Sequence, residues 1–93
     1  MTDRLEVDGY YERGGVYFWT EANQEAPDSF RGVANITMPN AAGDALLPDL
    51  KVKLPEVTRT MDEAMNAAHG YAIGLIDSGA AKTMINAYAR SLP

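Results

Sequence analysis

The period of the hydrophobic pattern changes at Thr60, and this change constrains the fold more than any other feature of the sequence. Before Thr60, apolar and polar residues alternate in short runs, the period of two that is typical of half-buried strands. After it, apolar residues recur every three or four positions, as on one face of an amphipathic helix. Strands followed by helices predict an α+β fold, in which the helices cover one face of an antiparallel sheet.

The strands are expected to be consecutive in an antiparallel meander of three to four members. They span residues 4–12, 16–22, 30–38 and 50–54. Gly14-Gly15 can adopt the positive φ angles of a tight hairpin turn, and Asn23–Ser29 is rich in turn-forming residues. Pro48 and Pro55 bracket the last strand, which suits an edge position.

Two helices are expected, at residues 61–78 and 80–91, with Gly79 between them. Thr60 to Glu63 matches a capping box, in which the Thr60 hydroxyl accepts a hydrogen bond from the Glu63 amide. The first helix is expected to pack on one face of the sheet, and the second is shorter. Both helices and the sheet should belong to one small domain covering residues 1–93, because a chain of this length cannot build two cores.

A two-residue loop at Gly14-Gly15 would pair Arg13 with Val16 and thereby separate the side chains onto two faces of the sheet. One face is expected to form the core with the first helix. Its strand residues would be Leu5, Val7, Tyr11, Val16, Phe18 and Ala22, and its helix residues Met61, Met65, Ala68, Ala72 and Leu75.

The opposite face would carry three large aromatic side chains rimmed by four carboxylates. These are Tyr10, Tyr17 and Trp19 with Glu6, Asp8, Glu12 and Glu21. Tyrosine and tryptophan are enriched in interface hot spots, so the pattern predicts a partner-binding patch. Asp8 would lie opposite Glu21, and like charges facing one another across strands favour a nearby cation or basic partner.

Three alternatives compete with this interpretation of the aromatic face. Lys51 and Lys53 could neutralise its carboxylates from within the sheet. The second helix, with Met84, Ile85 and Tyr88, could cover its aromatic rings. A slip of one residue in the pairing of the first two strands would exchange the faces.

The charge and composition exclude several classes of function. The net charge is −5, and the first 30 residues hold all of this excess, with seven acids against two bases. No cluster of basic residues is present to bind nucleic acid directly. No apolar run approaches the roughly 20 residues of a membrane span, and the N-terminus does not resemble a signal peptide. The absence of cysteine agrees with a reducing, cytoplasmic location.

No catalytic motif, metal site or cofactor site is predicted. His69 is the only histidine, and no cysteine is available to complete a zinc site; we expect it at the edge of the helical stripe. The serines lie outside any nucleophile elbow. We therefore expect a small acidic, non-enzymatic binding module of the inhibitor, immunity or adaptor type, whose partner is a basic protein. The alternative is a homo-oligomeric structural or ligand-binding domain whose aromatic face is buried between subunits.

Overall fold

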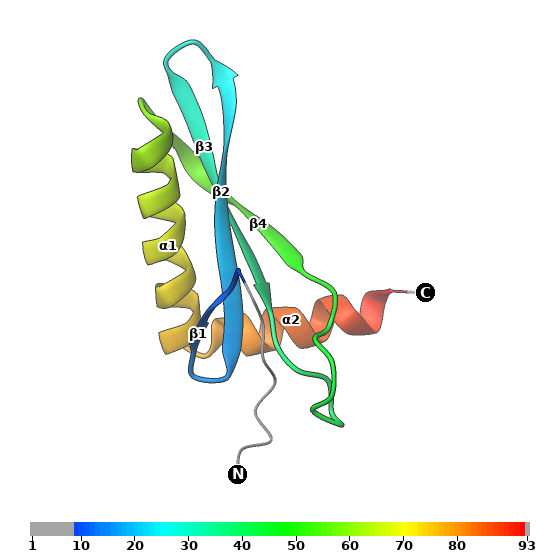
Figure 1. Ribbon diagram of the computed structural model, residues 1–93. Helices are drawn as coiled ribbons and strands as arrows, with labels where there is room; N and C mark the ends of the chain where they lie inside the picture. The colour runs from blue at the N-terminus through cyan, green and yellow to red at the C-terminus, as the bar shows by residue number, and fades with distance from the viewer. Residues whose placement is uncertain (1–8, 93) are drawn as a thin grey trace.

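A computed structural model describes residues 9–92 and shows one antiparallel sheet followed by two helices (Figure 1). The elements are β1 (Tyr11–Arg13), β2 (Val16–Ala26), β3 (Ser29–Thr37), β4 (Leu50–Thr58), α1 (Met61–Asp77) and α2 (Ala80–Ser91). The strand order is β1-β2-β3-β4. The predicted α+β meander with two C-terminal helices is thus confirmed. No helix among the described residues is long and apolar enough to cross a membrane.

The hairpin between β1 and β2 has the predicted register over the residues described. Arg13 pairs with Val16, and Tyr11 pairs with Phe18. Gly14 and Gly15 have φ angles of 58° and 84°, the left-handed conformation that a two-residue hairpin turn requires at both positions. Residues 4–8 of the predicted first strand, including Leu5, Glu6, Val7 and Asp8, lie outside the described residues.

β4 is longer than the sequence pattern predicts, because it continues through Pro55 to Thr58. Proline lacks the N–H group that a strand donates, so Pro55 indicates a strand end. The strand instead accommodates it with a shift in the pairing of β3 and β4 between Arg31 and Val33. The Arg31 Nη1 atom donates to the Leu54 carbonyl oxygen at 2.6 Å and so satisfies a backbone acceptor at this irregularity.

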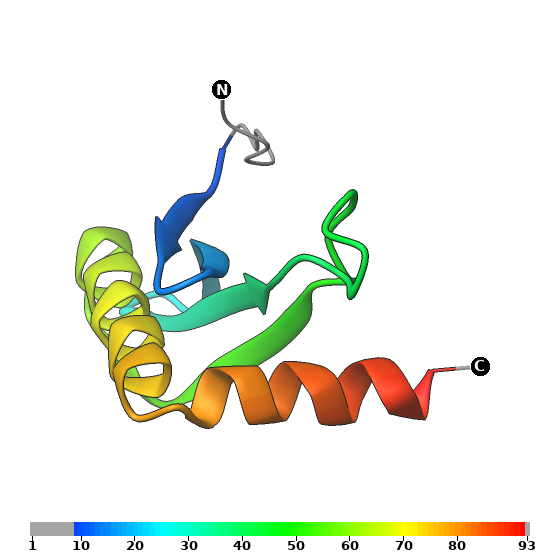
Figure 2. The same cartoon turned by 90° about the horizontal axis from the view of Figure 1, so that it is seen from below.

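The inner face of the sheet, defined by Phe18, Ala34, Ile36 and their neighbours in register, forms the core with the helices. The core cluster comprises Val16, Phe18, Ala34, Ile36, Ala72, Ala81 and Ile85. Figures 1 and 2 show α1 running along the sheet and α2 turning across its end. Because Ile85 of α2 is fully buried in this core, the alternative in which α2 covers the aromatic face of the sheet is wrong.

α1 buries alanines, whereas two predicted core methionines are exposed. Its buried residues are Ala64, Ala68 and Ala72, while Met61 is 51% and Met65 37% exposed. The reason is the close approach of α1 to β3: a Cβ atom on Gly32 would overlap the Ala64 carbonyl oxygen and lie 3.2 Å from the Ala68 Cβ atom. At such a distance only small side chains fit beneath the helix, so the larger methionines lie at its flank.

Tyr11 is also more exposed than predicted. It is 57% exposed, although its ring lies 5.4 Å from the Phe18 ring and 4.9 Å from the His69 ring. β1 is the edge strand at this point, so one side of the Tyr11 ring faces solvent. His69 is half-buried at the edge of the stripe, where it was expected. The capping box of α1 is also present, with Glu63 N donating to Thr60 Oγ1 at 3.1 Å.

Candidate functional site

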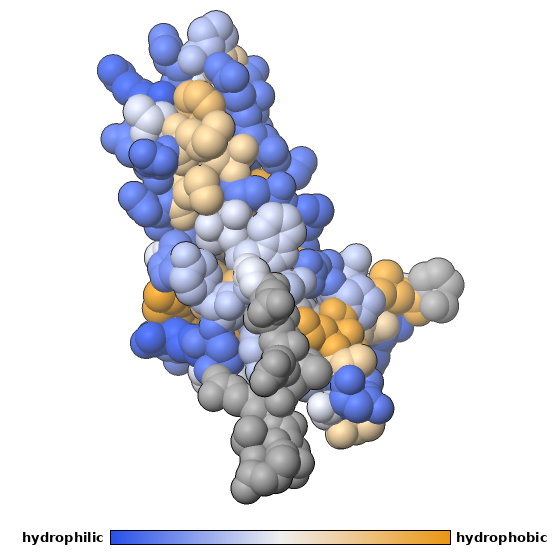
Figure 3. Space-filling model, in the orientation of Figure 1, coloured by the Kyte–Doolittle hydropathy of each residue, from blue (hydrophilic) through white to orange (hydrophobic). Residues whose placement is uncertain are grey.

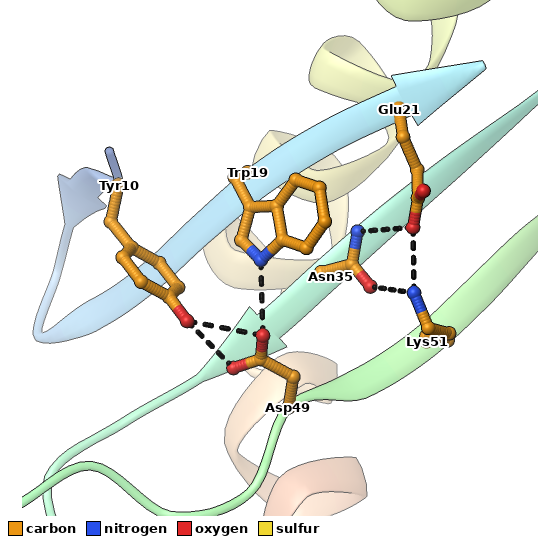
Figure 4. Close-up of polar contacts among 6 residues, drawn as sticks. All are labelled: Tyr10, Trp19, Glu21, Asn35, Asp49 and Lys51. Atoms are coloured by element: carbon orange, nitrogen blue, oxygen red, sulfur yellow. Dashed lines mark hydrogen bonds and ion pairs between the residues drawn. The ribbon is translucent and has the colours of Figure 1, made fainter. Parts of the chain in front are cut away.

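The outer face of the sheet, which points away from α1, carries the predicted aromatic residues. Antiparallel register partners lie on the same face, so Trp19 of β2 shares this face with Asn35 of β3 and Lys51 of β4. We define the outer face by these residues together with Tyr10, Tyr17, Glu21 and Asp49. Figure 4 shows that the polar groups form two separate clusters, one at Asp49 and one at Glu21.

Asp49 is the acceptor of the first cluster. The Tyr10 hydroxyl lies 3.0 Å from both Asp49 carboxylate oxygens, and the Trp19 Nε1 atom donates to Oδ2 at 3.0 Å. Burial raises the pKa of Tyr10, and the hydrogen bond to Asp49 and the negative charge of that carboxylate raise it further. Tyr10 therefore stays neutral at physiological pH and acts as a donor. Both donors are uncharged, and no ion pair of Asp49 with a base occurs within residues 9–92.

Glu21, Asn35 and Lys51 form the second cluster. The Lys51 Nζ atom lies 2.6 Å from Glu21 Oε2 and donates to Asn35 Oδ1 at 3.0 Å, while Asn35 Nδ2 donates to Glu21 Oε2 at 3.0 Å. The hydrogen bonds from Lys51 and Asn35 lower the pKa of Glu21. The proposed neutralisation of the face by Lys51 is therefore correct for Glu21. The Lys51 Nζ atom also lies 5.4 Å from the centroid of the Trp19 ring, a cation–π distance.

The three predicted aromatic residues lie together, but they differ in accessibility. Tyr10 and Tyr17 meet edge-to-face with ring centroids 6.5 Å apart. Tyr17 is only 8% exposed, whereas Tyr10 and Trp19 are half-buried. Among the described aromatic residues of this face, Tyr10 and Trp19 therefore provide most of the accessible surface.

Two of the four carboxylates of the predicted rim, Glu12 and Glu21, lie among the described residues. Glu12 lies at the hairpin, where its Oε2 atom accepts a hydrogen bond from the Gly15 amide at 3.0 Å, so it stabilises the turn. Glu21 is paired with Lys51. Glu6 and Asp8 lie outside the described residues.

Sequence reasoning missed Asp49 and Asn35, which organise the two clusters. Alternation along β4 places residues 49, 51 and 53 on one face, so the period of two that locates Lys51 also predicts the position of Asp49. Asn35 is the register partner of both Trp19 and Lys51. It is fully buried, and both ends of its amide are hydrogen-bonded.

The described part of the chain encloses no detectable pocket, and it contains no group of three or more His, Asp or Glu residues that could hold a metal ion. The candidate site is therefore a surface and not a cavity. Comparisons with protein-family models, with curated proteins and with solved structures found no match to this chain.

Proposed function

We propose that this chain is a small non-enzymatic protein-binding module, of the inhibitor, immunity or adaptor type, that engages a basic protein through the outer face of its sheet. The main support for this proposal is the environment of Asp49. Its carboxylate is oriented by the neutral donors Tyr10 and Trp19 and has no basic partner among the described residues. Its charge is thus presented beside two half-buried aromatic rings.

This arrangement suits an arginine side chain of the partner. A guanidinium group can hydrogen-bond to a carboxylate and stack on an indole ring at the same time, which an ammonium group does less well. Lys51 already approaches the Trp19 ring as a cation. The hydrogen bonds that hold Asp49 and Trp19 also reduce the entropy lost when a partner orders these side chains.

The acidic charge of the chain supports the same class of partner. The net charge is −5, so long-range attraction would accelerate encounter with a basic surface. Net charge alone does not determine where on this chain a basic partner binds, because several exposed acids lie elsewhere on the surface. A test must therefore separate a specific contact at Asp49 from general attraction.

Asp49→Asn is the variant that makes this separation, because it removes the charge and keeps the size of the side chain. The simplest basic probe is a heptaarginine peptide, titrated while the Trp19 indole N–H signal is followed by NMR. We expect Asp49→Asn to weaken binding by at least about tenfold, since a charge-assisted hydrogen bond contributes about 1.5–3 kcal/mol. Glu56→Gln is the matched control, because Glu56 is exposed on β4 and its substitution changes the net charge equally.

The control should bind the peptide within about twofold of the wild type at moderate salt, because exposed charges are largely screened beyond roughly 10 Å. An equal loss in both variants would mean that only net charge attracts the peptide, and the proposed site would be wrong. An unchanged Trp19 indole signal at saturation would lead to the same conclusion.

A further inference from the structure

The second cluster brings together three functional groups that can react with one another. An amine on β4, a carboxamide on β3 and a carboxylate on β2 are in mutual contact (Figure 4). Lys51 and Asn35 are register partners on neighbouring strands. Glu21 lies on the same face of the next strand and reaches both of them. Three adjacent strands therefore hold a nucleophile, an electrophile and a base at one point of the sheet.

The Asn35 carboxamide is fixed in place and shielded from water. Asn35 is fully buried, its Nδ2 atom donates to Glu21, and its Oδ1 atom accepts from Lys51. Asparagine is uncommon in strands, and burial of an amide costs free energy unless both of its ends are hydrogen-bonded. Because water does not reach this carboxamide, hydrolysis does not compete with attack by a neighbouring side chain.

The Lys51 amine lies close to the carbon atom that it would attack. Its Nζ atom is 3.0 Å from Asn35 Oδ1, and a C=O bond is about 1.23 Å long, so Nζ lies no more than about 4.2 Å from Asn35 Cγ. The Lys51 side chain is 60% exposed, so a rotation can bring Nζ to the roughly 3–3.5 Å of a near-attack geometry. Only the lysine has to move, since the carboxamide is fixed.

Glu21 contacts both of the nitrogen atoms that exchange protons in such an attack. Its Oε2 atom lies 2.6 Å from Lys51 Nζ, the nucleophile, and accepts a hydrogen bond at 3.0 Å from Asn35 Nδ2, the leaving group. The lowered pKa of Glu21 keeps its carboxylate in the basic form. One carboxylate oxygen can therefore remove a proton from the amine and deliver it to the departing nitrogen, first as general base and then as general acid.

The amine is accessible to solvent, although the carboxamide is not. An ammonium group is not a nucleophile, so Lys51 must first release a proton. Lys51 and Lys53 are both exposed on β4, whereas the apolar surface visible in Figure 3 lies over α1, the adjoining part of β2 and α2. The proton can therefore pass from Lys51 to water, and a small leaving group can depart along the same path.

We propose that Lys51 and Asn35 join in an intramolecular isopeptide bond, which the chain forms by itself with Glu21 as the proton carrier. The neutral Nζ atom attacks Cγ with its lone pair, and a tetrahedral intermediate forms. Glu21 takes one proton from Nζ and passes it to Nδ2. The Cγ–Nδ2 bond then breaks, its electron pair stays on nitrogen, and ammonia leaves. The proton that Lys51 first released converts ammonia to ammonium, so atoms, charge and electrons balance without an oxidant or a further reactant.

The bond would link β3 to β4 covalently and change the charge of the outer face. The Lys51 cation becomes part of a neutral amide, so the net charge of the chain becomes one unit more negative. Glu21 loses the cation with which it now forms an ion pair. The structure shows the three side chains before this reaction.

The product is identified by its mass. Freshly purified wild type, kept at about pH 8 and about 37 °C, should lose about 17 Da, the mass of one ammonia, in at least roughly a tenth of the chains within about a week. Trypsin should then fail to cleave after Lys51, because its amine is acylated, and the peptide 32–53 should be recovered lighter by the same mass. An asparagine that cyclises with its own backbone also loses ammonia, but it leaves Lys51 cleavable.

Three variants test the roles of the side chains, and far-UV circular dichroism checks that each one folds. Lys51→Arg keeps the positive charge and should not react, because a guanidinium group is always protonated. Glu21→Gln should slow the reaction at least about 100-fold, since a general base contributes roughly 10²–10⁴-fold. The matched control is Lys53→Arg, which makes the same change as Lys51→Arg two residues further along β4 and should react at the wild-type rate.

Four results would overturn the proposal. They are an unchanged wild-type mass after the week, cleavage after Lys51 in the lighter product, loss of ammonia from Lys51→Arg at the wild-type rate, and an unchanged rate in Glu21→Gln. Asp49→Asn should form the bond as the wild type does, because Asp49 belongs to the other cluster. This proposal and the function proposed above therefore fail independently.

Discussion

Gly32→Ala tests the account of how α1 packs on the sheet. Gly32 lies on β3 beneath α1, and an added Cβ atom would overlap the Ala64 carbonyl oxygen. A backbone oxygen inside a helix cannot rotate away as the end of a flexible side chain can. The helix or the strand must therefore move, and such a shift disturbs the contacts of Ala68, whose Cβ atom lies 3.2 Å from the added atom.

The expected loss of stability follows from two opposing effects. Adding a methyl group to a well-packed core costs about 1–3 kcal/mol, and a rigid backbone contact lies at the upper end of this range. Replacing glycine by alanine also restricts the unfolded chain, which returns about 0.4–1 kcal/mol. The net destabilisation should be about 2 kcal/mol, which lowers the melting temperature by roughly 8–16 °C in a domain of this size.

Gly70→Ala is the matched control, because it makes the same chemical change in α1 where no atom other than those of the adjoining helical backbone lies within 4 Å of the added Cβ atom. It should stabilise the protein by about 0.5–1 kcal/mol, since alanine is the better helix former. Urea unfolding followed by far-UV circular dichroism measures both variants at low micromolar concentration. If Gly32→Ala unfolds within about 0.5 kcal/mol of the wild type, which is the usual range of a neutral surface change, the proposed close approach of α1 is wrong.

Two further predictions concern the core and the outer face. Ile85→Ala should destabilise the protein by about 2–5 kcal/mol in urea unfolding, because Ile85 is fully buried and joins α2 to the core; a surface-like change would contradict this. Glu21 has a lowered pKa in the folded state, so its contribution to stability is present above its unfolded pKa and is lost as pH falls through the folded value. Unfolding midpoints from about pH 5 to pH 2 should therefore fall less steeply in Lys51→Met than in the wild type.

The features that were predictable from the sequence depend on local rules. The period change at Thr60 locates the boundary between strands and helices, the capping box marks the start of α1, and Gly14-Gly15 determine the register of the first hairpin. Each of these involves residues close together in the chain. Their physical causes, namely side-chain alternation, hydrogen bonds to the first helical turn and positive φ angles, act before the tertiary structure forms.

The features that sequence reasoning missed depend on contacts between distant segments. A helical wheel locates the apolar stripe of α1, but it does not show which residues of the stripe face the sheet. Here the close approach of α1 at Gly32 determines that alanines face the sheet and that Met65 is exposed. Asp49 is separated from Trp19 by 30 positions and from Tyr10 by 39. Its role becomes visible only when the register of all the strands is combined with the alternation along β4.

The ion pairs of the sheet indicate which acidic residues of an acidic module would contact a basic partner. Seven acids lie in the first 30 residues, and two of them, Glu21 and Glu25, lie on β2. Within the sheet, however, Glu21 is paired with Lys51 and Glu25 with Arg31, so much of that charge is already compensated. Asp49 lies outside the acidic region of the sequence and is held by neutral donors alone among the described residues. A partner's arginine would displace an existing ion pair at Glu21 but none at Asp49, and binding energy should therefore depend on Asp49 more than on the acids that dominate the sequence.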